Sequence, residues 1–304
     1  MKLKSILLAA CLFTGLNSFA QNRGNEVGFQ SDNDSFLAQG SDRYYTNGFF
    51  LYFRHALDVK GNQNLVNKVL GFEIGQKIYN AQSGSLPSVD YVDRPVAGYL
   101  YLGSSLNLLY KNESNLKLSA KVGVVGPAAG GYPIQRFIHN TFGFYTLNSW
   151  QYQIRNGAEL NLSAEYNKLL GRFDWADISL TSYANLGNGF TGAGVGPMLR
   201  LGNFNQLFQS VSTQSTASKN RSQGLLHQHE LFFYYKPQIN VVAYDATVQG
   251  SLFKDHPEAR TQEVTGDIKP VVFSNQLGAS YAGGRFIFDF SAIFDTKDVR
   301  GMVH

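Results

Sequence analysis

The chain has 304 residues, of which 14% are aromatic and only 16% are charged. This composition excludes a disordered protein, since disordered chains are poor in aromatic side chains and rich in charge. The formal net charge of +4 falls to +2 when Lys2 and Lys4 leave with a predicted export signal. That balance excludes the strongly basic footprint of a nucleic-acid-binding protein.

Residues 1–20 are predicted to be a signal peptide, because two lysines precede an apolar stretch that ends at the small-x-small site Ser18-Phe19-Ala20. The segment Leu8-Ala9-Ala10-Cys11 also resembles the lipobox of a lipoprotein, but the apolar run continues past Cys11. Cleavage after Ala20 would remove the only cysteine, so no disulfide is expected in the mature protein.

Residues 21–304 are predicted to form one outer-membrane β-barrel domain. Beyond Ala20 no stretch approaches the roughly 20 apolar residues of a membrane helix. Apolar and polar residues instead alternate, for example over 116–124, 158–166 and 286–294. A soluble β-sandwich also alternates, but these runs have about the 9–11 residues of a membrane-spanning strand.

Eleven strands are expected from this alternation. They are Asn25–Ser31, Tyr45–Ala56, Gly71–Tyr79, Ala97–Leu109, Leu116–Val125, Gln153–Tyr166, Phe173–Leu186, Ala193–Leu201, Glu230–Tyr244, Lys269–Tyr281 and Arg285–Asp295. Single-chain bacterial barrels have an even number of strands. We therefore expect a transmembrane antiparallel β-barrel of twelve strands whose closing strand is missing because the sequence is cut short; a miscounted strand is the alternative.

The loops between strands predict a polar cluster at one end of the barrel. If the N-terminus is periplasmic, the first outer loop carries Asp32-Asn33-Asp34 and Asp42, and the second carries Asp93-Arg94. The third outer loop, residues 126–151, carries His139. All three loops should meet at the extracellular rim. Parity places the connection 202–229 on the periplasmic side, where short turns are the rule, although it is long and polar.

A short amphipathic helix is predicted in the third outer loop, from Pro133 to Leu147, with His139 beside its apolar stripe. A single histidine on a helix more often serves packing than catalysis. The carboxylates of the first loop could, however, bind a divalent cation through oxygen. A cation beside a neutral imidazole is a workable arrangement for ester hydrolysis.

At these residues the sequence resembles the outer-membrane lipid A 3′-O-deacylase family (LpxR-like proteins). The segments that carry the resemblance are Ser31-Asp32-Asn33-Asp34-Ser35-Phe36, Asp42-Arg43-Tyr44-Tyr45-Thr46-Asn47-Gly48, Asp93-Arg94-Pro95-Val96-Ala97-Gly98, Gly126-Pro127-Ala128-Ala129-Gly130-Gly131 with Gln135 and His139, and Trp150-Gln151-Tyr152-Gln153. The resemblance implies a monomeric outer-membrane barrel of a Gram-negative bacterium. It also implies Ca²⁺-dependent removal of ester-linked acyl chains from lipid A, a modification of lipopolysaccharide.

Residue by residue, the resemblance implies that His139 is the general base and that Asp34 ligates the metal or orients the base. Asn33 and Thr46 would position metal or substrate. Where some family members have a glutamate after the helix, this chain has Tyr145. From the residues themselves, the guanidinium groups of Arg43, Arg94 and Arg136 suit the phosphates of the head group.

Two other functions compete with that of a lipid A hydrolase. An outer-membrane phospholipase needs a nucleophilic serine with histidine and asparagine, and no such spacing surrounds His139. A non-enzymatic barrel, either a porin or a structural protein, is the remaining alternative. A porin of this kind more often has 16 or more strands, and the bulky residues Tyr52, Arg54 and Glu73 are expected to fill the lumen.

Overall fold

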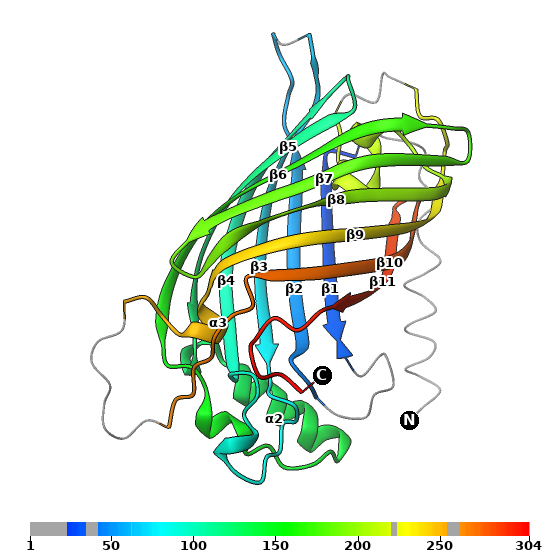
Figure 1. Ribbon diagram of the computed structural model, residues 1–304. Coiled ribbons are helices and arrows are strands. Elements are labelled where there is room, and N and C mark those ends of the chain that lie inside the picture. Colours follow the sequence, from blue (N-terminus) through cyan, green and yellow to red (C-terminus); the bar gives the residue numbers. More distant parts are fainter. Residues whose placement is uncertain (1–22, 35–41, 62, 220–223, 254–261, 304) are drawn as a thin grey trace, which may run out of the picture.

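The computed structural model describes residues 23–34, 42–61, 63–219, 224–253 and 262–303. The predicted signal peptide lies outside the described residues. Eleven strands form one antiparallel sheet in which each strand pairs with the next along the chain. Figure 1 shows this sheet curling around a common interior. The strands are β1 (Asn25–Asn33), β2 (Tyr45–Ala56), β3 (Leu65–Tyr79), β4 (Ala97–Tyr110), β5 (Ser114–Val125), β6 (Gly157–Arg172), β7 (Ala176–Gly187), β8 (Phe190–Asn203), β9 (Glu230–Asp245), β10 (Val271–Gly283) and β11 (Phe286–Asp295).

The predicted antiparallel barrel fold is confirmed, and each of the eleven expected strands is present. Alternate residues of the strands leave large apolar side chains exposed on the outward face of the sheet, including Phe29, Leu51, Ile74, Leu102 and Leu160. The residues between them face the interior. No helix among the described residues is long and apolar enough to span a membrane. The twelfth, closing strand stays a prediction.

Short helices lie between the strands. They are the 3-10 helices η2 (Val89–Tyr91), η3 (Pro127–Ala129), η4 (Ser149–Tyr152), η5 (Leu207–Gln209) and η6 (Val211–Thr213) and the α-helices α2 (Gly131–Phe142) and α3 (Ala246–Gln249). Figure 1 places α2 and α3 at the same end of the sheet as the end of β1. We call this the α2 end of the barrel.

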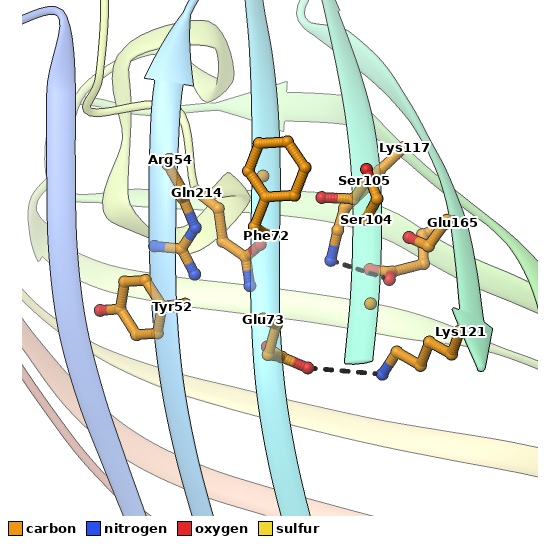
Figure 2. A pocket seen from close by; sticks show the side chains of 13 residues that line it. Tyr52, Arg54, Phe72, Glu73, Ser104, Ser105, Lys117, Lys121, Glu165 and Gln214 are labelled. Carbon is orange, nitrogen blue, oxygen red and sulfur yellow. Dashed lines mark hydrogen bonds and ion pairs between the residues drawn. The ribbon is translucent and has the colours of Figure 1, made fainter. Parts of the chain in front are cut away.

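The interior of the barrel is polar and holds ion pairs instead of an apolar core. Tyr52, Arg54 and Glu73, which were expected in the lumen, line a cavity of about 90 Å³ there. Glu73 accepts a hydrogen bond from Tyr101 at 2.5 Å and pairs with Lys121 at 3.5 Å. Figure 2 shows the side chains of Glu73 on β3 and Lys121 on β5 pointing toward one another. Bulky and paired side chains therefore occupy the barrel lumen.

The long connection between β8 and β9 folds into the barrel at the end opposite α2. We call residues 204–219 the plug. Its backbone carbonyls at Thr213, Ser215 and Ala217 accept hydrogen bonds from the side chains of Asn107 and Asn67, which lie on strands across the interior. Phe208 and Ala217 pack there against Ala56, Val66, Val69 and Leu109. This accounts for a long polar segment at an end where short turns are expected.

A buried arginine holds the plug to its own strand. Arg200 donates to both carboxylate oxygens of Asp177, at 2.8 and 2.6 Å, and both side chains are almost fully buried. The same guanidinium donates to the hydroxyl of Ser210 at 2.8 Å and to the carbonyl of Asn205 at 3.1 Å. Arg200 thereby fixes the beginning of the plug to β7 and β8.

We expect Arg200→Met to lower the free energy of unfolding by about 3–5 kcal/mol, because it leaves the Asp177 carboxylate buried without its main partner. Urea unfolding of the protein in detergent micelles measures this loss. The matched control is Lys117→Met, which breaks a pair with Glu165 whose side chains are 19% and 42% exposed. That change should cost less than about 1 kcal/mol. Equal losses of unfolding free energy in the two variants would show that Arg200 does not hold the plug to β7 and β8.

Candidate functional site

Helix α2 packs on the outward face of the sheet, over β3 and β4. On β4 the exposed Leu102 marks the outward face, which it shares with Gly98. A Cβ at Gly98 would lie 3.2 Å from the backbone nitrogen of Gly131, so a side chain here would crowd the start of the helix. Gln76 of β3 donates to the carbonyl of Ala129 at 2.6 Å just before the helix. The helix therefore covers the outside of the barrel wall.

The helix is shorter than the predicted segment from Pro133 to Leu147. Pro133 lies in the first turn, where the missing amide hydrogen breaks no helical hydrogen bond. Gly143 adopts a left-handed conformation with φ of 72°, and the amide of Phe144 donates back to the carbonyl of His139 at 2.9 Å. This is a Schellman-type ending, which turns the chain back toward the helix.

One carboxylate oxygen joins the first loop to α2. Asp42 Oδ2 lies 2.9 Å from Gln135 Nε2, 2.7 Å from His139 Nε2 and 2.9 Å from the Tyr145 hydroxyl. Gln135 and His139 are four residues apart, so both project from the buried face of the helix. The indole nitrogen of Trp150 donates to Gln135 Oε1 at 2.7 Å and fixes which way the amide points.

The second ring nitrogen of His139 determines where its proton lies. Nδ1 is 2.8 Å from the backbone carbonyl of Tyr145, and a carbonyl can only accept, so Nδ1 carries a hydrogen. Nε2 is then the atom that exchanges a proton with Asp42 or with a water molecule. Burial and the nearby Asp42 carboxylate raise the pKa of Tyr145 to about 12, so its hydroxyl remains a donor at neutral pH.

Two other predicted site residues, Asn33 and Thr46, lie at the α2 end of β1 and β2. Asn33 shares the outward face of β1 with Phe29, and it donates to Asn47 Oδ1 at 2.8 Å. Thr46 is the extra residue of a β-bulge between β2 and β3, and it is fully buried. Its hydroxyl accepts a hydrogen bond from Asn80 at 3.0 Å. Bulges of this kind redirect a side chain beside a functional site.

Hydrogen bonds confirm that the three loops meet at one end of the barrel, as predicted. Asp34 Oδ2 accepts from the backbone nitrogen of Arg43 at 2.7 Å, which ties the end of β1 to the residue after Asp42. Asp93 of the second loop accepts from the Tyr44 hydroxyl at 2.9 Å. The Asp42 contacts then reach α2. Asp34 and His139 are thus connected through Arg43 and Asp42.

Arg94 is not placed to contact a phosphate, and this expectation is corrected. Its side chain is 1% exposed and donates to Asp298, to the carbonyl of Pro95 and to Thr247. Burial alone would lower the pKa of Arg94, but the carboxylates of Asp298 and Asp245 outweigh burial and raise it. Arg94 thus binds internal carboxylates. Arg43 is half-buried and Arg136 is exposed on α2.

The oxygen atoms at this site suit a hard cation such as Ca²⁺. The amide oxygen of Asn80 is buried without a hydrogen-bond partner, while its nitrogen donates to Thr46; Asn33 and Asp34 offer further oxygen atoms. In the described parts of the chain, no three His, Cys, Asp or Glu side chains gather as a metal centre. Amide and hydroxyl oxygens, backbone carbonyls and water would supply part of the coordination, as they do in many Ca²⁺ sites.

Comparisons with known proteins identify the family. A family model described as "Outer membrane protein LpxR" matches residues 6–304. The chain belongs to the LpxR family. Among solved structures, LpxR from Salmonella typhimurium superposes with a TM-score of 0.72 at 23% identity, over 91% of this chain and 95% of that one. At this identity the superposition shows the shared fold. No curated protein sequence matches the chain.

Within this LpxR family member, sequence reasoning missed the partner of His139. Asp42 was considered only as one carboxylate of a cation site, although it is the residue that contacts the imidazole. Tyr145 was noted as a departure from the family pattern, yet its hydroxyl and carbonyl both hold the pair in place. The spacing of four between Gln135 and His139 was the available signal, because it places both residues on one helix face.

Proposed function

We propose that this protein hydrolyses ester-linked acyl chains of lipid A, as a lipid A 3′-O-deacylase does. The observation that carries the proposal is the His139–Asp42 contact at 2.7 Å beneath a helix on the outward face of the barrel. An outer-membrane barrel meets lipid on that face. A lipid ester could therefore reach the pair from the membrane without entering the lumen.

In the proposed reaction His139 is the general base. Its Nδ1 hydrogen is held by the Tyr145 carbonyl, so Nε2 receives the proton when water attacks the ester carbonyl. Water must enter between Nε2 and Asp42 for this step. Asp42 then stabilises the imidazolium, and the proton passes to the alkoxide that leaves. The products are a free fatty acid and lipid A with a hydroxyl in place of the ester.

Asn33, Asp34 and Thr46 are proposed to hold the cation and substrate beside this pair. The buried oxygen of Asn80 next to Thr46 supports a cation at this position. When bound, Ca²⁺ would stabilise the negative charge that develops on the ester oxygen. Arg43 and Arg136 are the remaining proposed contacts for the phosphates. A monomer suffices, since all of these residues come from one chain.

The α2 end is proposed to face the cell exterior. Lipid A occupies the outer leaflet, so a hydrolase that acts on it needs its active site at the extracellular rim. The turns at the opposite end, such as Lys111–Glu113 between β4 and β5, are short, as is usual on the periplasmic side. The plug would then close the periplasmic end of the barrel.

We expect His139→Ala to lower the rate of lipid A deacylation by about 100- to 10,000-fold, the usual contribution of a general base. Mass spectrometry of lipid A from cells expressing each variant measures the missing acyl chain. His55→Ala is the matched control, because that imidazole contacts Asn25 at the opposite end of the barrel. Trimming that persists in His139→Ala would rule out the base assignment.

Chelation tests the cation. EGTA should abolish deacylation by the purified protein in detergent, and added Ca²⁺ should restore it, because the proposed oxyanion would lose its counter-charge. Deacylation is followed by release of free fatty acid. Undiminished release in EGTA would remove Ca²⁺ from the proposal while leaving the His139–Asp42 pair in place.

Conductance separates the hydrolase from a porin. The plug and the paired interior side chains should leave the protein without stepwise ion current in a planar bilayer. Replacing plug residues 206–218 by a short glycine-serine turn should raise conductance, because the Asn67 and Asn107 contacts across the interior are removed. Heat-dependent migration on gels verifies that the variant is folded. A steady current through the wild-type protein would favour the porin.

A further inference from the structure

An exposed aromatic surface lies next to the site. Phe137 and Phe142 of α2 and Phe144 just after it are 70%, 69% and 58% exposed. We call these three residues the aromatic patch. Exposing three large apolar rings to water within one short segment is unfavourable, and such a surface in a soluble region usually marks an interaction site.

Helix α2 separates apolar from polar side chains along its exposed side. Ile134 and Phe137 lie three residues apart on one side of the helix, and Phe142 is its last residue, while Arg136 and Asn140 lie four residues apart on another side. The buried face between them carries Gln135 and His139. A helix with one apolar and one basic flank is typical of helices that lie at a membrane interface, with the basic flank toward phosphates.

The helix that carries Phe137 and Phe142 of the aromatic patch lies on the outward face of the barrel. It rests on β3 and β4 through Gly98 and Gln76, and those strands expose Ile74 and Leu102 to the surroundings. This outward face is the membrane-facing surface of an outer-membrane barrel. The partner that fits a continuous apolar surface of this kind is therefore a lipid hydrocarbon chain.

Ring contacts lead from the patch to the imidazole. The rings of Phe142 and Phe144 are stacked with centroids 5.9 Å apart. Phe144 in turn meets His139 edge-on at 5.5 Å. The patch thus begins at the surface and ends on the residue proposed as the base. A hydrocarbon chain lying on these rings would bring the carbonyl at its end close to His139.

We propose that the aromatic patch binds the acyl chain that is to be removed and thereby selects long-chain esters. The inference rests on the proposed function. A long chain gains apolar contact with Phe137 and Phe142, whereas a short chain ends before it reaches them. The patch therefore determines chain-length specificity, and the His139–Asp42 pair performs the same chemistry on any ester that reaches it.

Kinetics on two esters test the selection. Phe137→Ser and Phe142→Ser should each lower kcat/KM for an ester of a 14-carbon acid about tenfold or more, the loss expected when one buried phenyl ring is removed. The same variants should leave kcat/KM for a butanoyl ester unchanged. Phe253→Ser is the matched control, because Phe253 is 78% exposed in the connection after β9 and should affect neither ester. An equal loss on both esters, or no loss on either, would overturn the inference.

A reporter without catalysis separates this inference from the proposed function. Trp175→Phe removes the exposed native tryptophan and leaves the buried Trp150. In that background Phe137→Trp should be quenched in vesicles of phospholipid with brominated acyl chains, relative to unbrominated vesicles. Lack of quenching would place the patch in water and overturn the inference even if the enzyme is active. If the reporter variant is quenched but the wild-type protein hydrolyses no ester, the lipid contact of the patch stands and only the proposed hydrolysis is refuted.

Discussion

The alternation of side chains along a strand is the constraint on which the rest of this structure depends. Each residue of β1–β11 faces either the interior or the surroundings, and no third position exists. Apolar residues occupy the outward positions along most of the sheet, and polar residues are paired inside it. Polar residues on the outward face therefore need cover. Asn33 and Asn47 occupy such positions at the α2 end, Asn80 follows directly after β3, and the loops of that end cover them.

This constraint explains why the candidate site is built from loops. Strands alone cannot hold a histidine and a carboxylate on a lipid-facing surface, because both groups would lose water without gaining partners. Helix α2 brings its own buried face, so His139 is enclosed between the helix and the barrel wall. Asp42 reaches it from the first loop, and its Oδ2 accepts hydrogen bonds from Gln135 and Tyr145 while lying 2.7 Å from His139 Nε2. The loops thus form a polar layer between the sheet and the aromatic patch.

Much of the fold could be predicted from the sequence, because a period of two is a local property. β2 begins and ends where alternation predicts. β3 begins at Leu65 instead of Gly71, since Val66, Asn67 and Val69 all contact the plug and break the alternation there. The plug itself could not be predicted. Its length and polarity were visible, but the residues that receive it lie more than a hundred positions earlier in the chain.

Residue types in the sequence indicated candidate site residues, but they did not indicate where the helix ends or which groups Arg94 contacts. Gly143 was available to mark the end of the helix, yet apolar residues continue beyond it, so the predicted segment ran on to Leu147. Arg94 illustrates the opposite limit. An arginine beside an aspartate in a loop suggests a rim charge, and only the folded chain brings Asp298 and Thr247 to its guanidinium.

A tyrosine at position 145, where the resemblance led us to expect a glutamate, has a physical consequence for the pair. A tyrosine hydroxyl donates where a carboxylate would accept, so it adds a hydrogen bond to Asp42 and no second negative charge beside His139. Asp42 then carries the only side-chain carboxylate that contacts the imidazole among the described residues. The charge that balances the imidazolium during proposed turnover thus comes from the first loop. Because that loop is also tied to Asp34 through Arg43, a cation at Asp34 and a proton on His139 would be coupled through one short stretch of backbone.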